Sequence, residues 1–227
     1  MADIIIYGLH ASPFVRKALI FAEEKGVDVE LQEANPFAPA DWFLEINPAK
    51  RIPVMRDRRV GTEGAQGTIP DSSAICAYLE ARCPEPALYP ADPFDRGRAV
   101  WIEEYADSEL AGTIGLGIFR PVFFSLFAGK EPDADTARQC FNEKLPPILD
   151  YLDTQLADRE YFSGQSLSIA DISVVVQLQA LELAGGHVDS ERWPQLAGLQ
   201  QRLSEREAFA GALEAARARL PPHGVRL

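Results

Sequence analysis

The dipeptide Ile52-Pro53, which lies between a loop and a strand-like run, constrains the fold of this chain more than any other feature. A proline that follows a β-type residue and precedes a strand is a candidate for a cis peptide bond. Such a bond turns the N–H and C=O of the preceding residue outward instead of into a sheet ladder. The sequence therefore predicts that Ile52 can pair its backbone with a short extended peptide.

A second polar pair, Asp71-Ser72, stands directly ahead of the helical pattern of Ala74, Ile75, Tyr78 and Leu79. The start of a helix offers free backbone N–H groups and the positive end of the helix dipole. A carboxylate beside those N–H groups lets one helix end hold both the ammonium and the carboxylate of an amino acid. The two features together predict a peptide-binding site.

Strand and helix signals alternate through the first part of the chain. They predict, in order, a strand at 4–7, a helix from 15 that ends near Gly26, a strand at 27–31, a short helix at 40–46, strands at 53–55 and 68–69, and a helix at 72–82. The stretch 58–67 is glycine-rich, and we expect a flexible loop there.

Prolines interrupt this pattern, and helical signals dominate after them. We expect a first domain at 1–83, a linker at 84–94 and an all-helical domain at 95–227. Two helix faces are predicted, and Pro146-Pro147 should kink or restart the second helix. Ser168 and Asp171 form a capping-box pattern for a further helix. The faces consist of Trp101, Ile102, Tyr105, Ala106 and Leu110, and of Phe141, Leu145, Ile148, Leu149, Leu152 and Leu156.

These features resemble the glutathione transferase superfamily over nearly the whole chain. The motif Ser12-Pro13-Phe14 is similar to that of the serine-using members, of a tau-, phi- or zeta-like bacterial style. The resemblance implies an α+β two-domain protein, in which a thioredoxin-like domain is followed by an all-α helical bundle. It also implies a transferase that activates the glutathione thiolate for attack on a hydrophobic electrophile, typical of detoxification.

Ser12 is the predicted catalytic residue. It precedes Pro13 at the expected first position of a helix, where N–H groups and the helix dipole converge and would stabilise a thiolate. A serine that only caps the helix is the alternative. Tyr7 is the rival hydrogen-bond donor, because tyrosine-using members place a phenol at the end of the first strand. A cysteine is absent from position 12, so thiol-disulfide exchange is not expected.

The resemblance also implies the residues that bind glutathione. The backbone of Ile52, with Pro53 cis, would pair with the tripeptide, and Asp71 and Ser72 would hold its γ-glutamyl end. The family more often has Glu or Gln at the position of Asp71. Lys50 could meet the glycyl carboxylate and Arg51 stands where relatives often have Gln, although both could instead belong to a solvated loop.

The second substrate is expected to lie between the domains. The segment 114–127 contains more apolar and aromatic residues than one buried helix face requires. Core packing, however, explains such residues more often than ligand contact does. The candidate substrate-binding residues are His10, Phe14, Tyr105, Ser108 and Phe119, with Ile114 and Phe123 as further wall positions.

The charge and cysteine content of the chain argue against several classes of binding partner. A formal net charge of −12 argues against nucleic acid and anionic membrane as partners. The start of the chain lacks the pattern of a signal peptide, so a cytoplasmic location is expected. Three cysteines without Cys-x-x-Cys spacing suggest neither a disulfide scaffold nor a metal site. We therefore expect no metal, and the resemblance to glutathione transferases implies glutathione as co-substrate and a homodimer.

Two other functions remain open. Asn47-Pro48-Ala49-Lys50 is similar to the Asn-Pro-Met-Lys of the isomerase branch, although the serine-rich loop of that branch is missing. A glutathione-dependent isomerase or lyase is therefore one alternative. A non-catalytic glutathione-binding module is the other.

Overall fold

The computed structural model describes residues 2–227. The chain forms two compact units, Met1–Leu88 and Tyr89–Leu227.

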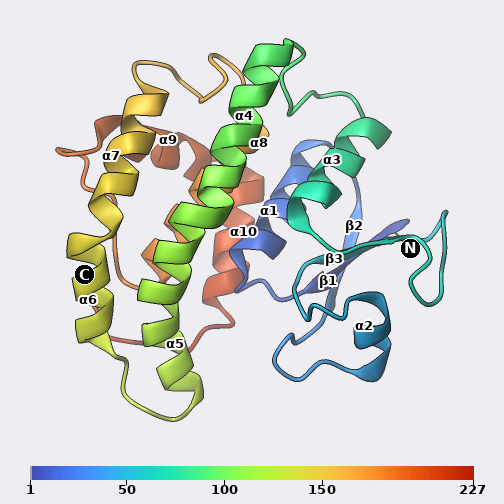
Figure 1. Cartoon of the computed structure of the whole chain (residues 1–227), viewed down its shortest axis with the longest axis horizontal. Coiled ribbons are helices and arrows are strands. Elements are labelled where there is room, and N and C mark those ends of the chain that lie inside the picture. The colour runs from blue at the N-terminus through green and yellow to red at the C-terminus, as the bar shows by residue number, and fades with distance from the viewer. Residues whose placement is uncertain (1) are drawn as a thin grey trace. The chain divides into compact units, whose positions relative to one another are not determined.

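The first unit is a four-stranded sheet with three helices (Figure 1). The strand order is β2-β1-β3-β4, with β1 parallel to β2 and antiparallel to β3. The order of elements is thioredoxin-like, as the sequence predicts. The elements are β1 (Ile4–Gly8), α1 (Pro13–Glu24), β2 (Val29–Glu33), α2 (Asp41–Ile46), β3 (Val54–Asp57), β4 (Thr68–Ile69) and α3 (Ser72–Arg82).

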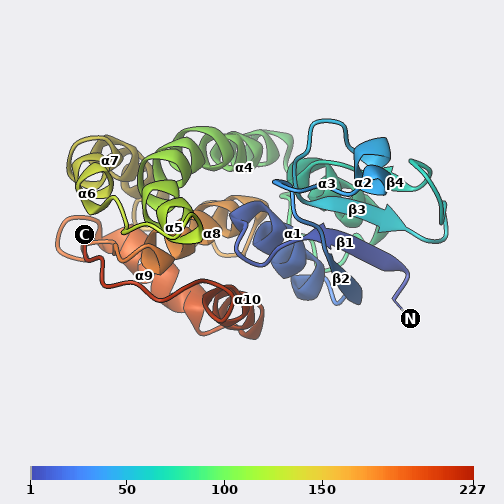
Figure 2. The same ribbon diagram turned by 90° about the horizontal axis from the view of Figure 1, so that it is seen from below.

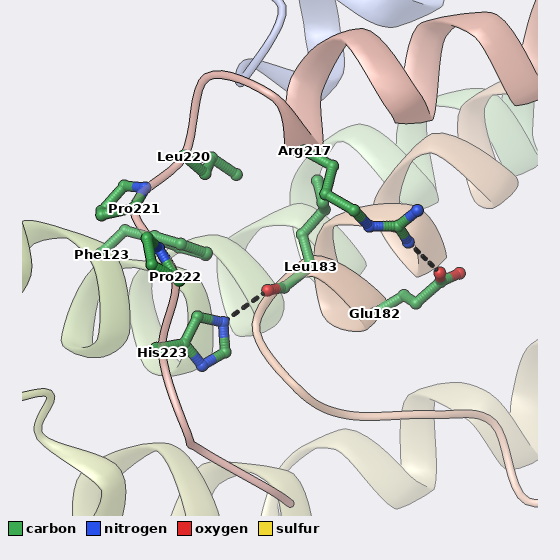
Figure 3. Close-up of a pocket in the computed structure, with 8 residues that line it drawn as sticks. All are labelled: Phe123, Glu182, Leu183, Arg217, Leu220, Pro221, Pro222 and His223. Carbon is green, nitrogen blue, oxygen red and sulfur yellow. Dashed lines mark hydrogen bonds and ion pairs between the residues drawn. The ribbon is translucent and has the colours of Figure 1, made fainter.

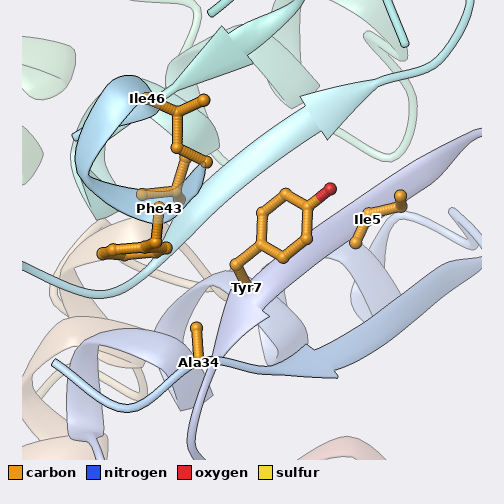
Figure 4. Packing of buried hydrophobic residues seen from close by; sticks show 6 residues of the cluster. Ile5, Tyr7, Ala34, Phe43 and Ile46 are labelled. Carbon is orange, nitrogen blue, oxygen red and sulfur yellow. The ribbon is translucent and has the colours of Figure 1, made fainter. Parts of the chain in front are cut away.

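The strand β1 is buried along its whole length. Its side chains alternate between the two faces of the sheet. Ile5 and Tyr7 pack with Phe43 and Ile46 of α2 in one hydrophobic cluster, which Figure 4 shows. By this alternation, Ile4 and Ile6 fall on the opposite face of the strand.

The second unit is helical, and α8 is its core. Almost every residue of α8 is buried, and α8 lies between α4 and α9 (Figure 2). The elements are α4 (Pro93–Tyr105), the π-helical turns η1 (Ala106–Leu110) and η2 (Gly112–Phe119), α5 (Arg120–Phe127), α6 (Ala134–Glu143), α7 (Leu145–Leu156), α8 (Ile169–Leu183), α9 (Pro194–Ser204) and α10 (Glu207–Arg217).

The predicted end of α1 and the predicted starts of α7 and α8 are confirmed. Gly26 follows α1 with a φ of 66°, and Pro146 and Pro147 lie in the first turn of α7. Ser168 and Asp171 form the capping box of α8: an Oδ2 of Asp171 accepts from the N–H of Ser168 at 2.9 Å and from its hydroxyl at 2.7 Å.

One residue of a predicted helix face is exposed. Ile102, Ala106 and Leu110 are buried, whereas Trp101 is 51% exposed. Adjacent helix positions differ by about 100° around the axis, so Trp101 falls outside the stripe that its neighbour Ile102 occupies. Its indole N–H instead donates to the hydroxyl of Tyr151 at 2.8 Å.

The helical run Pro93–Phe127 is long and apolar enough, by length and composition, to cross a membrane. The core helix of a soluble protein passes the same test, so one such run is weak evidence. The expectation of no membrane partner stays a prediction.

Candidate functional site

Strand register brings three predicted segments to one end of the sheet. Tyr7 near the end of β1 pairs with Val54 at the start of β3, and Met55 pairs with Ile69 at the end of β4. The loop that follows β1, the segment that precedes β3 and the start of α3 therefore leave the sheet at the same end. These segments carry Ser12, Ile52-Pro53 and Asp71-Ser72, respectively.

Ser12 is the N-cap of α1. Its Oγ accepts a long hydrogen bond of 3.4 Å from the N–H of Val15, and Pro13 occupies the first turn. A serine hydroxyl carries one donor and two acceptor positions. Because the described residues offer this O–H no acceptor, it remains able to donate at the positive end of the helix.

The turn before Ser12 is held from within α1. The N–H of Ser12 donates to the carbonyl of Leu9 at 3.0 Å. One guanidinium nitrogen of Arg16 donates to the carbonyls of His10 at 3.0 Å and Ala11 at 3.1 Å. Arg16 is fully buried, and this desolvation lowers its pKa to about 9, so the side chain stays cationic at neutral pH.

The Ile52–Pro53 peptide bond is cis, as predicted. Within residues 2–227, the N–H and C=O of Ile52 have no hydrogen-bond partner. Asn47 fixes the preceding turn, because its Nδ2 donates to the carbonyl of Arg51 at 2.8 Å. The backbone of Ile52 is therefore free to pair with an extended ligand.

Asp71 caps α3. Its Oδ1 accepts from the N–H of Ala74 at 3.0 Å, and the side chain is exposed, whereas Ser72 is buried. Lys50 and Arg51 are exposed on the adjoining turn, and Lys50 has a left-handed φ of 57°. A carboxylate and two cations thus border this end of the sheet.

Tyr7 lies on the face that α2 covers. Its hydroxyl accepts from Nε of Arg56 at 3.3 Å, and the centroid of its ring lies 5.1 Å from that of Trp42. The phenol oxygen thus accepts one bond within the sheet packing, and its O–H, like that of Ser12, has no acceptor among residues 2–227, so Tyr7 remains the rival donor. The same Arg56 donates to the carbonyls of Gly64 at 2.6 Å and Gln66 at 2.8 Å, which ties the loop at 58–67 to β3.

The proposed wall residues of the second substrate are not one set. Phe119 and Phe123 contact each other with ring centroids 4.5 Å apart, whereas Tyr105 stacks with Tyr151 at 4.7 Å. Ser108 is exposed and donates to the carbonyl of Glu104. Ile114 is fully buried, which assigns it to the core, where helix packing rather than a ligand surrounds it. His10 and Phe14 are half-buried near Ser12.

A hollow of about 280 Å³ lies in the second unit (Figure 3). Of the predicted wall residues, only Phe123 lines it. The ring of His223 contacts the carbonyl of Leu183 at 2.8 Å, and Arg217 pairs with Glu182 at 2.7 Å. The polar groups of this hollow are thus largely paired with one another.

Sequence reasoning assigned no role to Arg16 and Lys17, two further residues at this site. Both are 0% exposed. The available signal was two adjacent cations inside an otherwise apolar helix, which usually marks a solvated face. Among residues 2–227, no three His, Cys, Asp or Glu side chains cluster as a metal site requires, and the three cysteines form no disulfide.

Comparison with known proteins defines the family. The N-terminal domain of glutathione S-transferases matches residues 6–87, and the C-terminal domain matches residues 118–215. Together with the thioredoxin-like and helical units, these matches show that the chain belongs to the glutathione S-transferase superfamily.

Individual relatives are distant. Glutathione S-transferase U28 of Arabidopsis thaliana is 25% identical over 217 residues, 93% of this chain and 89% of its own. The uncharacterized GST-like protein YibF of Escherichia coli is 29% identical over 209 residues, 90% of this chain and 96% of its own.

Solved structures of glutathione S-transferases have a similar fold. A theta class enzyme from Xanthomonas axonopodis pv. citri, with glutathione bound, has a TM-score of 0.76 at 26% identity and covers 94% of this chain and 98% of its own. A glutathione S-transferase from Rhodospirillum rubrum has a TM-score of 0.80 at 25% identity and covers 92% of this chain and 91% of its own. The relatives belong to several classes, so the family is defined and the class is not resolved.

Proposed function

We propose that this protein is a serine-type glutathione transferase, of the tau-, phi- or zeta-like bacterial style, that conjugates glutathione to a hydrophobic electrophile. The observation that carries the proposal is Ser12 at the start of α1, with an O–H that is free to donate. A free thiol has a pKa of about 8.5, and lowering it by two units requires about 2.7 kcal/mol of thiolate stabilisation. A hydrogen bond to the sulfur and a helix terminus can together supply that.

In the proposed reaction, glutathione lies at the end of the sheet. Its backbone pairs with Ile52, and its γ-glutamyl end lies at Asp71, Ser72 and the start of α3, with Lys50 or Arg51 toward the glycyl carboxylate. The thiol proton leaves to solvent, the sulfur forms a bond to the electrophilic carbon, and the leaving group departs with its electron pair. Family membership and a glutathione-bound relative support this ligand.

The free backbone of Ile52 and the charged cap Asp71 favour glutathione binding in the alternatives as well. In an isomerase or lyase, glutathione would return unchanged, and in a binding module it would be held without turnover. A homodimer and a cytoplasmic location complete the proposal. Sedimentation at micromolar concentration tests the dimer, and a monomer there contradicts it.

The test compares Ser12→Ala with Tyr7→Phe. Glutathione affinity is measured by calorimetry, the bound thiolate by ultraviolet absorbance, and turnover with a dinitrohalobenzene. We expect Ser12→Ala to lower turnover about 100-fold with affinity nearly unchanged, because the hydroxyl acts on the thiolate more than on bound glutathione as a whole. Tyr7→Phe should keep the thiolate band. If the thiolate absorbance band is lost in Tyr7→Phe and kept in Ser12→Ala, Tyr7 and not Ser12 donates the hydrogen bond to the sulfur.

A further inference from the structure

Two adjacent cations of α1, Arg16 and Lys17, are both fully buried. Burying a charge without polar partners costs several kcal/mol, so buried cations are kept with hydrogen-bond acceptors. Adjacent helix positions point about 100° apart, so the two side chains leave α1 in different directions. Both donate hydrogen bonds to other residues of the first unit.

Arg16 reaches back to the loop ahead of α1. It donates to the carbonyls of His10 and Ala11, the two residues directly before Ser12. These bonds turn both carbonyl dipoles toward the guanidinium. The loop that sets the position of the Ser12 hydroxyl is thus fixed by a cation one helical turn further along.

Lys17 reaches across to α3. Its Nζ donates to the hydroxyl of Ser73 at 3.0 Å, in the first turn of that helix. Ser73 directly follows Asp71 and Ser72. The second half of the candidate glutathione site is therefore tied to the same helix as the first half.

We propose that Arg16 and Lys17 are positioning residues with separate tasks: Arg16 orients the Ser12 loop toward the thiol, and Lys17 orients the start of α3 toward the γ-glutamyl end. The proposal rests on the proposed function of the site. It makes α1 the element that sets the spacing between thiolate activation and ligand binding.

If the two tasks are separate, each of two variants should change one property of bound glutathione and leave the other unchanged. Arg16→Met should raise the pKa of the bound glutathione thiol by about one unit, a roughly threefold loss of thiolate at about pH 7 for a pKa that starts near about 6.5, with glutathione affinity within about twofold of the wild type. Lys17→Met should weaken glutathione affinity about tenfold and leave the thiol pKa unchanged. Lys17→Arg should restore the affinity.

Thiolate absorbance over pH and calorimetric titration with glutathione measure the two effects. Equal effects of both methionine variants on both measurements would mean a general loss of structure and would overturn the proposal. If Arg16→Met does not fold, Arg16→Lys replaces it. It keeps the charge but not the planar fork, so we expect a smaller rise in the thiol pKa. An unchanged thiol pKa in Arg16→Lys would then overturn the assignment to Arg16.

Amide hydrogen exchange in the free protein separates this proposal from the proposed function. Arg16→Met should speed exchange at Ser12 and Val15, and Lys17→Met should speed it at residues 72–74. If the wild type binds no glutathione, the proposed function fails, and this local pattern still supports the positioning roles. Faster exchange throughout the first unit, or at neither segment, would overturn them.

Discussion

The ammonium of Lys25 lies 2.6 Å from a carboxylate oxygen of Glu80, and both side chains are buried. The same ammonium donates to the carbonyl of Pro86 at 2.6 Å, and Glu80 accepts from the N–H of Leu88 at 3.3 Å. The pair therefore fastens the segment after α3, up to Leu88, onto the first unit.

Removing one partner of this pair should be costly. Glu80→Leu leaves the Lys25 ammonium buried without its carboxylate, and we expect the free energy of unfolding to fall by about 3 to 5 kcal/mol. Adding Lys25→Met should recover most of the loss. Urea unfolding measures both, with Arg138→Ala in an exposed ion pair as a control that leaves the midpoint unchanged. A double variant as unstable as the single one would contradict this account.

Asp71→Asn should separate the helix cap from the ligand contact. Asn and Asp cap helices about equally, so the melting temperature should stay unchanged. Loss of the charge should weaken glutathione binding about tenfold, as calorimetry can measure. Asp133→Asn, at the equivalent cap of α6, is the matched control and should change neither quantity. Unchanged affinity in Asp71→Asn would remove Asp71 from the binding site.

Gly117→Ala should destabilise the helical unit. An added Cβ would lie 2.2 Å from Sγ of Cys140 on α6, and relieving such overpacking costs about 1 to 3 kcal/mol. Cys140→Ala in the same chain should restore stability, because it removes the opposing sulfur. Gly115→Ala, which meets nothing within 4 Å, is the control and should be neutral or stabilising. A Gly117→Ala variant as stable as Gly115→Ala would refute the close approach.

Asp171 should make stability depend on pH. Burial raises its pKa from 3.8 to about 6, because desolvation outweighs the bonds from Phe162 and Ser168. Between these values the folded state keeps a proton that the unfolded state has lost. The contribution of Asp171 to the free energy of unfolding is therefore complete below about pH 4. About 3 kcal/mol of this contribution is lost as the pH rises through 6.

The comparison with Asp171→Asn isolates this titration, since the other ionisable groups are common to both proteins. The difference in unfolding free energy, wild type minus variant, should decrease from pH 4 to pH 7. An increase over that range would show that the hydrogen bonds, not burial, dominate the carboxyl group. Urea unfolding at fixed ionic strength is the measurement.

The local features of this protein were readable from its sequence. The cis Ile52–Pro53 bond, the cap at Asp71, the capping box of Ser168 and the restart at Pro146 all depend on residues within a few positions of one another. Such signals report backbone preferences that short-range sterics and hydrogen bonds set. The order of strands and helices followed from them.

Only the tertiary structure decided which side chains are buried and what they meet. Periodicity gives an angle around a helix but not the partner at that angle, so Trp101 was placed on one helix face with Ile102, and Arg16 and Lys17 received no partner. Long cationic side chains reach carbonyls and hydroxyls that are distant in sequence, as Lys17 reaches Ser73. The sequence determined the elements and their caps, and non-local packing decided how these cations join the two halves of the site.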